Sequence, residues 1–345
     1  MYKILNLKGL GVAGRQNELI ELALTHGFKG VEIDMVDLVG RHDALGKEFA
    51  CQFLQSANMD IGAFDLPIDF GGTDEEFVKS CESLETIMDL AETLNAKRCR
   101  IRIQPNSETV SFNENQDRHR ERIEDIAARM EGHGIRVGLF LQASQAVEAD
   151  GNYKFVQTAE EIMKLCKDIG HDNVGLSIDV WEWLAGSGGL DQISELDSKM
   201  IVEVIYSDLS AEATPGSLKR ADRVLPSTGG DPFSYKLAQH ILSGKVECGV
   251  SMGTDTHFFS GAHNRHNVVS HLSILLDKLI AGEEPVIIEE EPEVEGEEGA
   301  EGEGGDKAET KTDGKTDAKA DAKTDAKAEE KTDAKEEPKA AEAKV

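Results

Sequence analysis

Basic side chains are scarce in this 345-residue sequence, which holds 37 Lys and Arg residues against 66 Asp and Glu residues. From Glu289 onward there are 21 acidic and 10 basic residues, which leaves 45 acidic and 27 basic residues before that point. Both parts therefore carry net negative charge, which repels a phosphate backbone at long range. We expect no general nucleic-acid partner, although this balance still allows a local basic groove.

Long apolar runs and paired cysteines are also missing. No segment approaches the ~18 consecutive apolar residues of a membrane span, and the first residues lack a basic segment followed by an apolar one. We therefore expect a cytoplasmic protein with no membrane partner. The five cysteines are far apart, contain no CxxC pair and are expected to be buried free thiols; they are Cys51, Cys81, Cys99, Cys166 and Cys248.

Large apolar residues are almost absent after about Ile288, and aromatic residues are absent there. Such a composition cannot build a core. Tetrads similar to KTDA repeat from Lys311 to Lys335, so that like charges would stack along the faces of a helix. We predict one folded domain over residues 1–285 and a disordered, low-complexity acidic tail over 286–345. The tail would serve solubility or spacing, with partner binding as the alternative.

Short runs of aliphatic or β-branched residues recur along the first part, each followed by a stretch with helical periodicity. The eight runs are KILNL (from Lys3), GVEID (from Gly30), IGAFDLP (from Ile61), CRIRI (from Cys99), RVGLFL (from Arg136), VGLSID (from Val174), VEVIYSD (from Val202) and CGVSM (from Cys248). An open Rossmann sheet should show a GxGxxG turn after its first strand, and KGLGVAG matches that pattern only loosely. Eight regular units favour the alternative, an α/β fold of the (β/α)8 TIM barrel type.

The segments between these runs carry signals for helix ends. Thr73 and Glu76 have the spacing of a capping box, and the apolar residues from Phe77 to Ala91 step by three and four. Gly132 and Gly170 follow predicted helices at the position where a residue with positive φ is common. Amphipathic helices are therefore expected to cover the strands.

Polar residues end several of the predicted strands. In a (β/α)8 barrel the reaction centre lies at the carboxyl ends of the strands, so these residues are the first candidates for a functional site. They are Asp34, Asp65, Gln142, Asp179 with Glu182, and Asp208, and the loop GTDTHFFSGAHNRH follows the last strand.

Several segments, taken in order, resemble the sugar phosphate isomerase/epimerase family, also called xylose isomerase-like or AP endonuclease family 2 barrels. They are ELIELALTHGFKGVEID, AETLNAKRCRI, IAARMEGHGIRVGLFL, VGLSIDVWEWLAGSGG, VIYSDLS, LPSTGGDPFSYKLAQHI and CGVSM. The order and spacing of these segments over residues 1–283 carry the resemblance. It implies a TIM barrel, and with the acids at the strand ends it predicts isomerisation or epimerisation of a small sugar or sugar phosphate, a polyol or a keto acid by proton transfer next to a carbonyl.

The resemblance also implies a divalent metal such as Mg²⁺, Mn²⁺ or Zn²⁺. Family members usually hold it with a Glu ending the fifth strand, an Asp and a His at the sixth, a His and an Asp at the seventh, and a Glu ending the eighth. The corresponding residues here are Gln142, Asp179 with Glu182, Ile205 with Asp208, and Gly253. A degenerate site is therefore expected, in which Asp179 and Asp208 are the metal ligands that remain, or in which no metal binds.

Three residues are the candidates for catalysis. Glu182 or Asp179 would act as the base, and His257 or a metal as the electrophile. The alternative for Asp179 and Asp208 is a structural role, in which they accept hydrogen bonds from loop N–H groups in a barrel without activity. His271 has helical spacing to apolar neighbours and is expected to be packed instead.

Five residues are candidates for binding the substrate. Trp181 and Trp183 flank the candidate base, where an indole could stack on a sugar, or alternatively they plug the mouth of the barrel. Gly229 and Gly230 precede a predicted helix and could hold an anion through backbone N–H groups, or could simply form a turn. Gln142, at the end of the fifth strand, completes this set.

Two other functions stay open at this point. The substitutions at the metal positions also fit a non-catalytic sugar-binding or scaffold barrel. Cleavage at abasic DNA, as in a related branch of the family, requires three metals and a basic groove, and the sequence indicates neither of them.

Overall fold

A computed structural model describes residues 1–146, 153–213, 218–226, 232–255, 257–259 and 264–285. Contacts within the chain divide it into two units after Glu289, and the fold below is that of the first unit. The predicted tail, residues 286–345, lies outside the described residues, as do the candidates Gly229 and Gly230.

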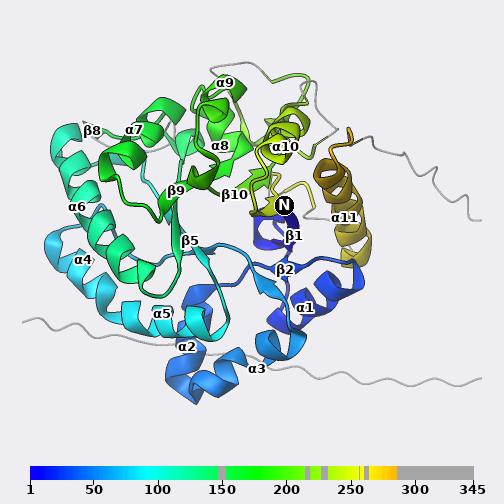
Figure 1. The fold of residues 1–345 in the computed structure, drawn as a ribbon, viewed down its shortest axis with the longest axis horizontal. Coiled ribbons are helices and arrows are strands. Elements are labelled where there is room, and N and C mark those ends of the chain that lie inside the picture. Colours follow the sequence, from blue (N-terminus) through cyan, green and yellow to red (C-terminus); the bar gives the residue numbers. More distant parts are fainter. Residues whose placement is uncertain (147–152, 214–217, 227–231, 256, 260–263, 286–345) are drawn as a thin grey trace, which may run out of the picture. The chain divides into compact units, whose positions relative to one another are not determined.

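Parallel strands form the centre of the first unit (Figure 1). Around the sheet they follow the order β3 (Asp60–Ile61), β2 (Gly30–Val31), β1 (Tyr2–Leu5), β13 (Gly249–Met252), β10 (Ile201–Tyr206), β9 (Val174–Asp179), β7 (Arg136–Phe140), β5 (Arg98–Arg102) and β4 (Phe64–Asp65). Only Gly62 and Ala63 separate β3 from β4 along the chain, so the two ends of this order meet and the sheet closes. The strands match the eight predicted runs, and the predicted TIM barrel is confirmed.

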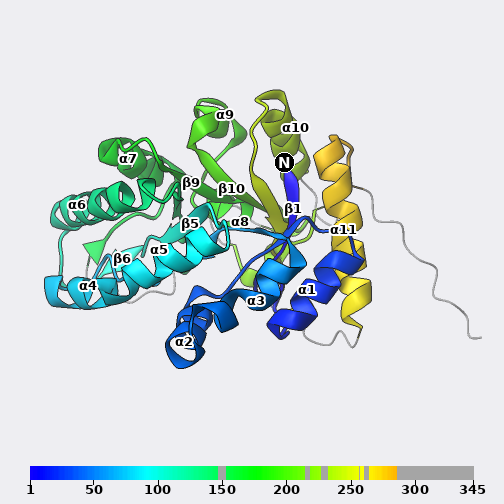
Figure 2. The same cartoon turned by 60° about the horizontal axis from the view of Figure 1, so that its bottom comes forward.

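Helices surround the barrel, with apolar faces packed on the strands (Figures 1 and 2). They are α1 (Gln16–Thr25), α2 (Met35–Leu45), α3 (Lys47–Ala57), α4 (Asp74–Ser80), α5 (Leu84–Thr93), α6 (Phe112–Glu131), α7 (Ala159–Ile169), α8 (Val180–Ala185), α9 (Leu190–Ser194), α10 (Phe233–Ser243) and α11 (Arg265–Ala281). A 3-10 turn over Cys81–Ser83 separates α4 from α5, so the apolar face predicted over Phe77–Ala91 belongs to two helices. Among the described helices, none has both the length and the apolar character to cross a bilayer.

The helix ends follow the predicted signals with one exception. Thr73 accepts the N–H of Glu76 and donates its own N–H to the Glu76 carboxylate, which confirms the capping box. Gly170 has φ +62° and ends α7 as predicted. Gly132 was predicted wrongly: its φ is −57°, and the positive φ occurs at Gly134. The last turn of α6 tightens through Gly132, so the chain reverses two residues later than expected.

Cysteines are free throughout the described residues, as predicted. Four of the five are buried, and Cys81 is only partly buried. They act as small apolar side chains of the core.

Arg100 of β5 is the centre of an ion cluster buried in the barrel. Its Nη2 lies 2.7 Å from an oxygen of Glu32 and donates to the carbonyl of Ala63, while its Nε lies 3.1 Å from Glu203 and 3.4 Å from Asp65. Burial raises the pKa of Glu32, against the opposing attraction of Arg100. Three acids around one cation carry excess negative charge at low dielectric, so retention of a proton on Glu32 relieves repulsion.

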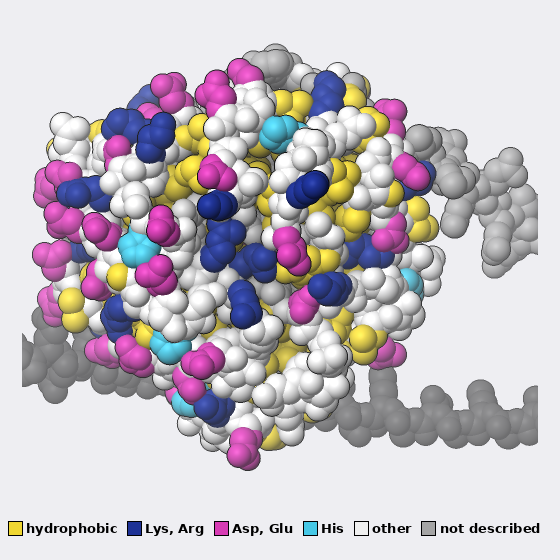
Figure 3. Space-filling view, in the orientation of Figure 1, with side chains coloured by type: hydrophobic (Ala, Val, Ile, Leu, Met, Phe, Trp, Pro, Cys, Tyr) yellow, Lys and Arg dark blue, Asp and Glu magenta, His cyan; other side chains and the backbone are white. Residues whose placement is uncertain are grey.

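Lys and Arg side chains gather near the middle of the face on which the N-terminus lies, with acidic side chains mostly around its edge (Figure 3). Arg98, which begins β5, donates to the hydroxyl of Tyr2 and the carbonyl of Glu247. Arg136, which begins β7, donates to the carbonyl of Ile201. These two arginines join the starts of strands that are not adjacent in the sheet: Arg98 links β5 to β1, and Arg136 links β7 to β10. They belong to the structural end of the barrel, opposite the carboxyl ends where the predicted site lies.

Two small antiparallel sheets lie outside the barrel. β6 (Asn106–Ser107) pairs with β8 (Tyr153–Lys154), and β11 (Asp208–Leu209) pairs with β12 (Arg223–Val224). The second sheet directly follows β10 at its carboxyl end. It therefore brings residues from a long connection to the predicted site.

Candidate active site

Glu182 lies in the first turn of α8, directly after β9, and is only 6% exposed. Ser144 donates its backbone N–H to one carboxylate oxygen at 2.8 Å and its hydroxyl to the other at 2.7 Å. Burial raises the pKa of Glu182 to about 7, and the negative charge of Asp179 raises it further, whereas the bonds from Ser144 and the charge of Arg223 oppose this shift. A carboxyl group with this pKa can accept and return a proton near neutral pH.

Asp179 ends β9 and is 4% exposed. Its Oδ1 accepts the N–H groups of Trp181 and Glu182 and so caps α8. Its Oδ2 lies 2.7 Å from Nη2 of Arg223, the first residue of β12. Both oxygens of this predicted base and metal ligand are thus engaged, and its partner Arg223 is a site residue that the sequence reasoning missed.

The guanidinium group of Arg223 lies against the backbone of Gly253, at the end of the last strand. A β carbon added to Gly253 would lie 2.8 Å from Cζ of Arg223, which is too close for any real contact. The carbonyl of Arg223 accepts hydrogen bonds from the hydroxyl of Thr254 and the N–H of Asp255, which fix β12 to the loop after β13. A side chain at residue 253 would therefore force the guanidinium of Arg223 to move from this position.

The other two polar strand ends differ in their contacts. Asp208, which is 3% exposed, accepts the N–H of Ser234 in the first turn of α10 at 2.9 Å. Gln142, which ends the β7 segment, is 4% exposed, and its Oε1 has no hydrogen-bond donor among the described residues. A buried acceptor without a donor is unfavourable, so Gln142 is suited to receive a hydrogen bond from a ligand.

Trp181 and Trp183 are buried, with exposed fractions of 3% and 2%. The indole N–H of Trp183 donates to the carbonyl of Gly189 at 3.1 Å. Most of both rings therefore packs within the protein, which favours the structural alternative over stacking on a sugar.

His257 is exposed in the loop after β13, and its backbone N–H donates to the side chain of Asp255. His271 is half-buried on α11, away from that loop in sequence. The role of His257 as an electrophile stays a prediction.

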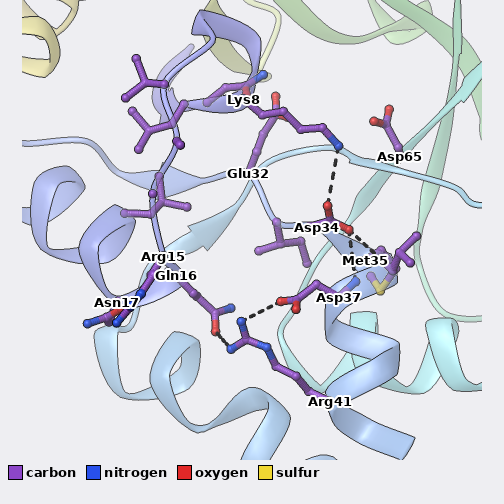
Figure 4. Close-up of a pocket in the computed structure, with 18 of the residues that line it drawn as sticks. Lys8, Arg15, Gln16, Asn17, Glu32, Asp34, Met35, Asp37, Arg41 and Asp65 are labelled. Carbon is purple, nitrogen blue, oxygen red and sulfur yellow. Dashed lines mark hydrogen bonds and ion pairs between the residues drawn. The ribbon is translucent and has the colours of Figure 1, made fainter. Parts of the chain in front are cut away.

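A cavity of about 1200 Å³ opens at the carboxyl ends of β1, β2 and β4 (Figure 4). Arg41 forms part of its wall, where it donates to Gln16 at 2.9 Å and pairs with Asp37 at 2.7 Å. The lining includes Asn6, Lys8, Arg15, Gln16, Glu32, Asp34, Asp37, Arg41, Asp65 and Pro67. So many fixed polar groups suit a small polyhydroxy ligand. Most of these residues lie beyond the strand ends, where sequence reasoning had no signal to find them.

The residues at the expected metal positions do not fit a divalent cation. Ile205 and Gly253 have no ligating side-chain atom, and Gln142 offers only a neutral amide. Asp179 already binds the guanidinium of Arg223, whose charge would repel a second cation nearby. Within the described residues, no three His, Cys, Asp or Glu side chains are grouped so that they could hold a metal ion.

A sequence model of the family described as xylose isomerase-like TIM barrel matches residues 20–239, which is more than half of the chain. The chain belongs to this family. A search of curated proteins found no significant match.

Solved structures with the same fold agree with this assignment. A xylose isomerase domain protein from Alicyclobacillus acidocaldarius subsp. acidocaldarius is 19% identical, with a TM-score of 0.71, 82% of this chain covered and 99% of that one. The IOLI protein, described with a binding zinc atom, is 16% identical, with a TM-score of 0.66 and coverages of 81% and 98%. D-psicose 3-epimerase from Clostridium cellulolyticum H10, described with D-tagatose, is 12% identical, with a TM-score of 0.60 and coverages of 81% and 99%. At these identities the likeness establishes the fold.

Proposed function

We propose that this chain is an isomerase or epimerase that acts on a small sugar or a related polyhydroxy carbonyl compound. The observation that carries the proposal is Glu182, a buried carboxyl group at the carboxyl end of β9 whose pKa burial raises to about 7. Buried acids with such a pKa are common at sites of proton transfer. The open acceptor of Gln142, after the neighbouring strand β7, adds a group that can hold a hydroxyl group.

In the proposed reaction, the carboxylate of Glu182 removes the proton from the carbon next to the carbonyl. The electrons of that C–H bond move to the carbonyl oxygen and form an enediolate. In an epimerisation, a proton from solvent adds to the other face of that carbon. In an isomerisation, the proton on Glu182 adds to the neighbouring carbon, and the hydroxyl proton moves from one oxygen of the enediolate to the other, so that the carbonyl forms at the second carbon. Ser144 holds the carboxylate in one orientation throughout, which favours transfer along a single direction.

Two similar structures support this substrate class. One is a D-psicose 3-epimerase with D-tagatose, and another is the same type of enzyme in the presence of D-fructose. A third is described as a probable 3-DHS dehydratase.

Exchange of substrate hydrogen with solvent tests the proposal. The full chain would be incubated in D₂O with a panel of aldoses, ketoses, their phosphates and 2-keto acids, and deuterium at the carbon next to the carbonyl would be measured by mass spectrometry. We expect exchange with at least one compound, its loss in Glu182→Gln, and normal exchange in Glu195→Gln, a change at an exposed glutamate of α9's C-terminal end. Absence of both exchange and conversion with every compound would reject an isomerase or epimerase.

A non-catalytic sugar-binding barrel is the second candidate. Asp179 and Asp208 both accept N–H groups at the start of a helix, which is a structural role. In that case the same panel should contain a compound that raises the melting temperature without exchange or conversion.

We also propose that residues 286–345 are a tail separate from the barrel. A chain ending at residue 285 should then keep the melting temperature and the exchange activity of the full chain. A fall of several degrees would show that the tail contributes to the folded domain.

A further inference from the structure

We infer that Arg223 is the built-in cation of this site and does for the substrate oxygen what a divalent metal would do, so that the reaction needs no metal. The inference rests on the proposed function. It gives a role in that function to Arg223, a residue that is not one of the family's expected metal ligands. It also narrows the substrate to compounds with two neighbouring oxygens, such as a carbonyl beside a hydroxyl group.

Three contacts place the guanidinium at the carboxyl ends of the strands. Nη2 binds Asp179 at the end of β9, the group lies over Gly253 at the end of β13, and the backbone of Arg223 is fixed by Thr254 and Asp255. The expected metal pattern would have an acid at position 253. Position 253 is a glycine in this chain, and the guanidinium of Arg223 fills the space next to Asp179, the acid that remains.

Arg223 keeps hydrogen-bonding capacity that the protein does not use. Its side chain is 18% exposed, and its buried Nε has no acceptor among the described residues. A planar guanidinium presents pairs of parallel N–H groups, which match two oxygens on adjacent atoms. A purely structural arginine would be expected to satisfy its buried donors with protein acceptors.

The position relative to Glu182 suits the proposed reaction. Both residues contact Asp179: Arg223 binds its Oδ2 through Nη2, and Glu182 donates its backbone N–H to its Oδ1. Glu182 removes the proton, and the negative charge develops on the substrate oxygen that Arg223 binds. The guanidinium neither gains nor loses a proton in this scheme. It stabilises the enediolate by charge and hydrogen bonds.

The first experiment measures exchange in protein treated with EDTA, with and without added Mg²⁺, Mn²⁺ or Zn²⁺. We expect EDTA to leave exchange unchanged. Arg223→Ala should lower kcat by roughly 100-fold or more, with a smaller effect on KM. Arg223→Lys should lose less activity than Arg223→Ala. Guanidinium chloride at millimolar concentration should restore exchange to Arg223→Ala, whereas sodium chloride should not. Arg220→Ala, an exposed arginine of the same segment, should match the unmodified chain. Exchange that EDTA abolishes and a metal restores would overturn the inference.

The second experiment does not depend on activity. Isothermal titration with MnCl₂ should show no site in the unmodified chain, whereas Arg223→Ala/Gly253→Glu, which removes the cation and adds an acid, should bind Mn²⁺ with a stoichiometry near one. A site in the unmodified chain that Asp179→Asn abolishes would overturn the role of Arg223. If the panel shows no exchange, the proposed function fails while this titration still decides whether Arg223 replaces the metal. If the double variant does not fold, the titration of the unmodified chain with MnCl₂ is sufficient, because it shows directly whether a metal site exists beside Arg223.

Discussion

Ser144 donates two hydrogen bonds to the carboxylate of Glu182, one from its backbone and one from its hydroxyl group. Both bonds favour the charged carboxylate, whereas burial opposes it more strongly. The pKa near 7 is therefore a balance between the position of Glu182 after β9 and the loop after β7. Neighbouring strands of the barrel together set the proton affinity of the candidate base.

Removal of the Ser144 hydroxyl should move this balance. Ser144→Ala keeps the backbone bond and loses the side-chain bond, so the pKa of Glu182 should rise. The rate of exchange depends on the ionised base, and its pH profile should shift to higher pH by about one pH unit, which corresponds to a single hydrogen bond of about 1.4 kcal/mol. The pH dependence of kcat/KM measures it. A profile that stays in place would show that Glu182 is not the titrating base.

Glu182 should also make stability depend on pH. Its pKa in the folded chain, about 7, lies above its ordinary value of 4.5, so the folded state binds the proton more tightly. The resulting stabilisation is complete below pH 4.5 and is lost as the pH rises through 7. Relative to Glu182→Gln, the unmodified chain should lose on the order of 3 kcal/mol between pH 4.5 and pH 8. Urea unfolding at several pH values tests this, with Glu195→Gln as the control that should follow the unmodified chain.

Arg100 should be far more important for stability than Arg102 on the same strand. Arg100→Met leaves Glu32 and Glu203 buried without their cation, which should lower the free energy of unfolding by roughly 3–5 kcal/mol. Arg102 is 40% exposed and pairs with Asp65 near the surface, so Arg102→Ala should change it by less than about 1 kcal/mol. Urea denaturation of both variants measures the difference. Equal effects would contradict the account of the buried cluster.

Two glycines should respond oppositely to alanine. Gly253→Ala places a β carbon against the guanidinium of Arg223 and should cost about 1–3 kcal/mol of stability. Gly40 lies in α2, where a β carbon would meet nothing within 4 Å, so Gly40→Ala should stabilise the chain by roughly 0.5–1 kcal/mol. Thermal unfolding of the two variants gives both signs. Stabilisation by Gly253→Ala would mean that Arg223 does not need the space over residue 253.

Some parts of the site were within reach of sequence reasoning and others were not. Asp179 and Glu182 directly follow an apolar strand, so their place at the rim could be predicted from alternation alone. Ser144 and Arg223 lie in connections without such periodicity. Their contacts with Glu182 and Asp179 span 38 and 44 residues along the chain, and only the closed barrel brings them together.

The sequence by itself determined the barrel, because local alternation of apolar strands and amphipathic helices repeats eight times and each unit can bury its apolar face only against its neighbours. It also determined which residues stand at the strand ends. The tertiary structure decided the chemistry of that rim: it set a cation over Gly253, where the family pattern predicted an acid for a metal, and it buried Glu182 beside Ser144. Charge and proton affinity depend on groups distant in the chain but close in space, and periodicity carries no information about such pairs.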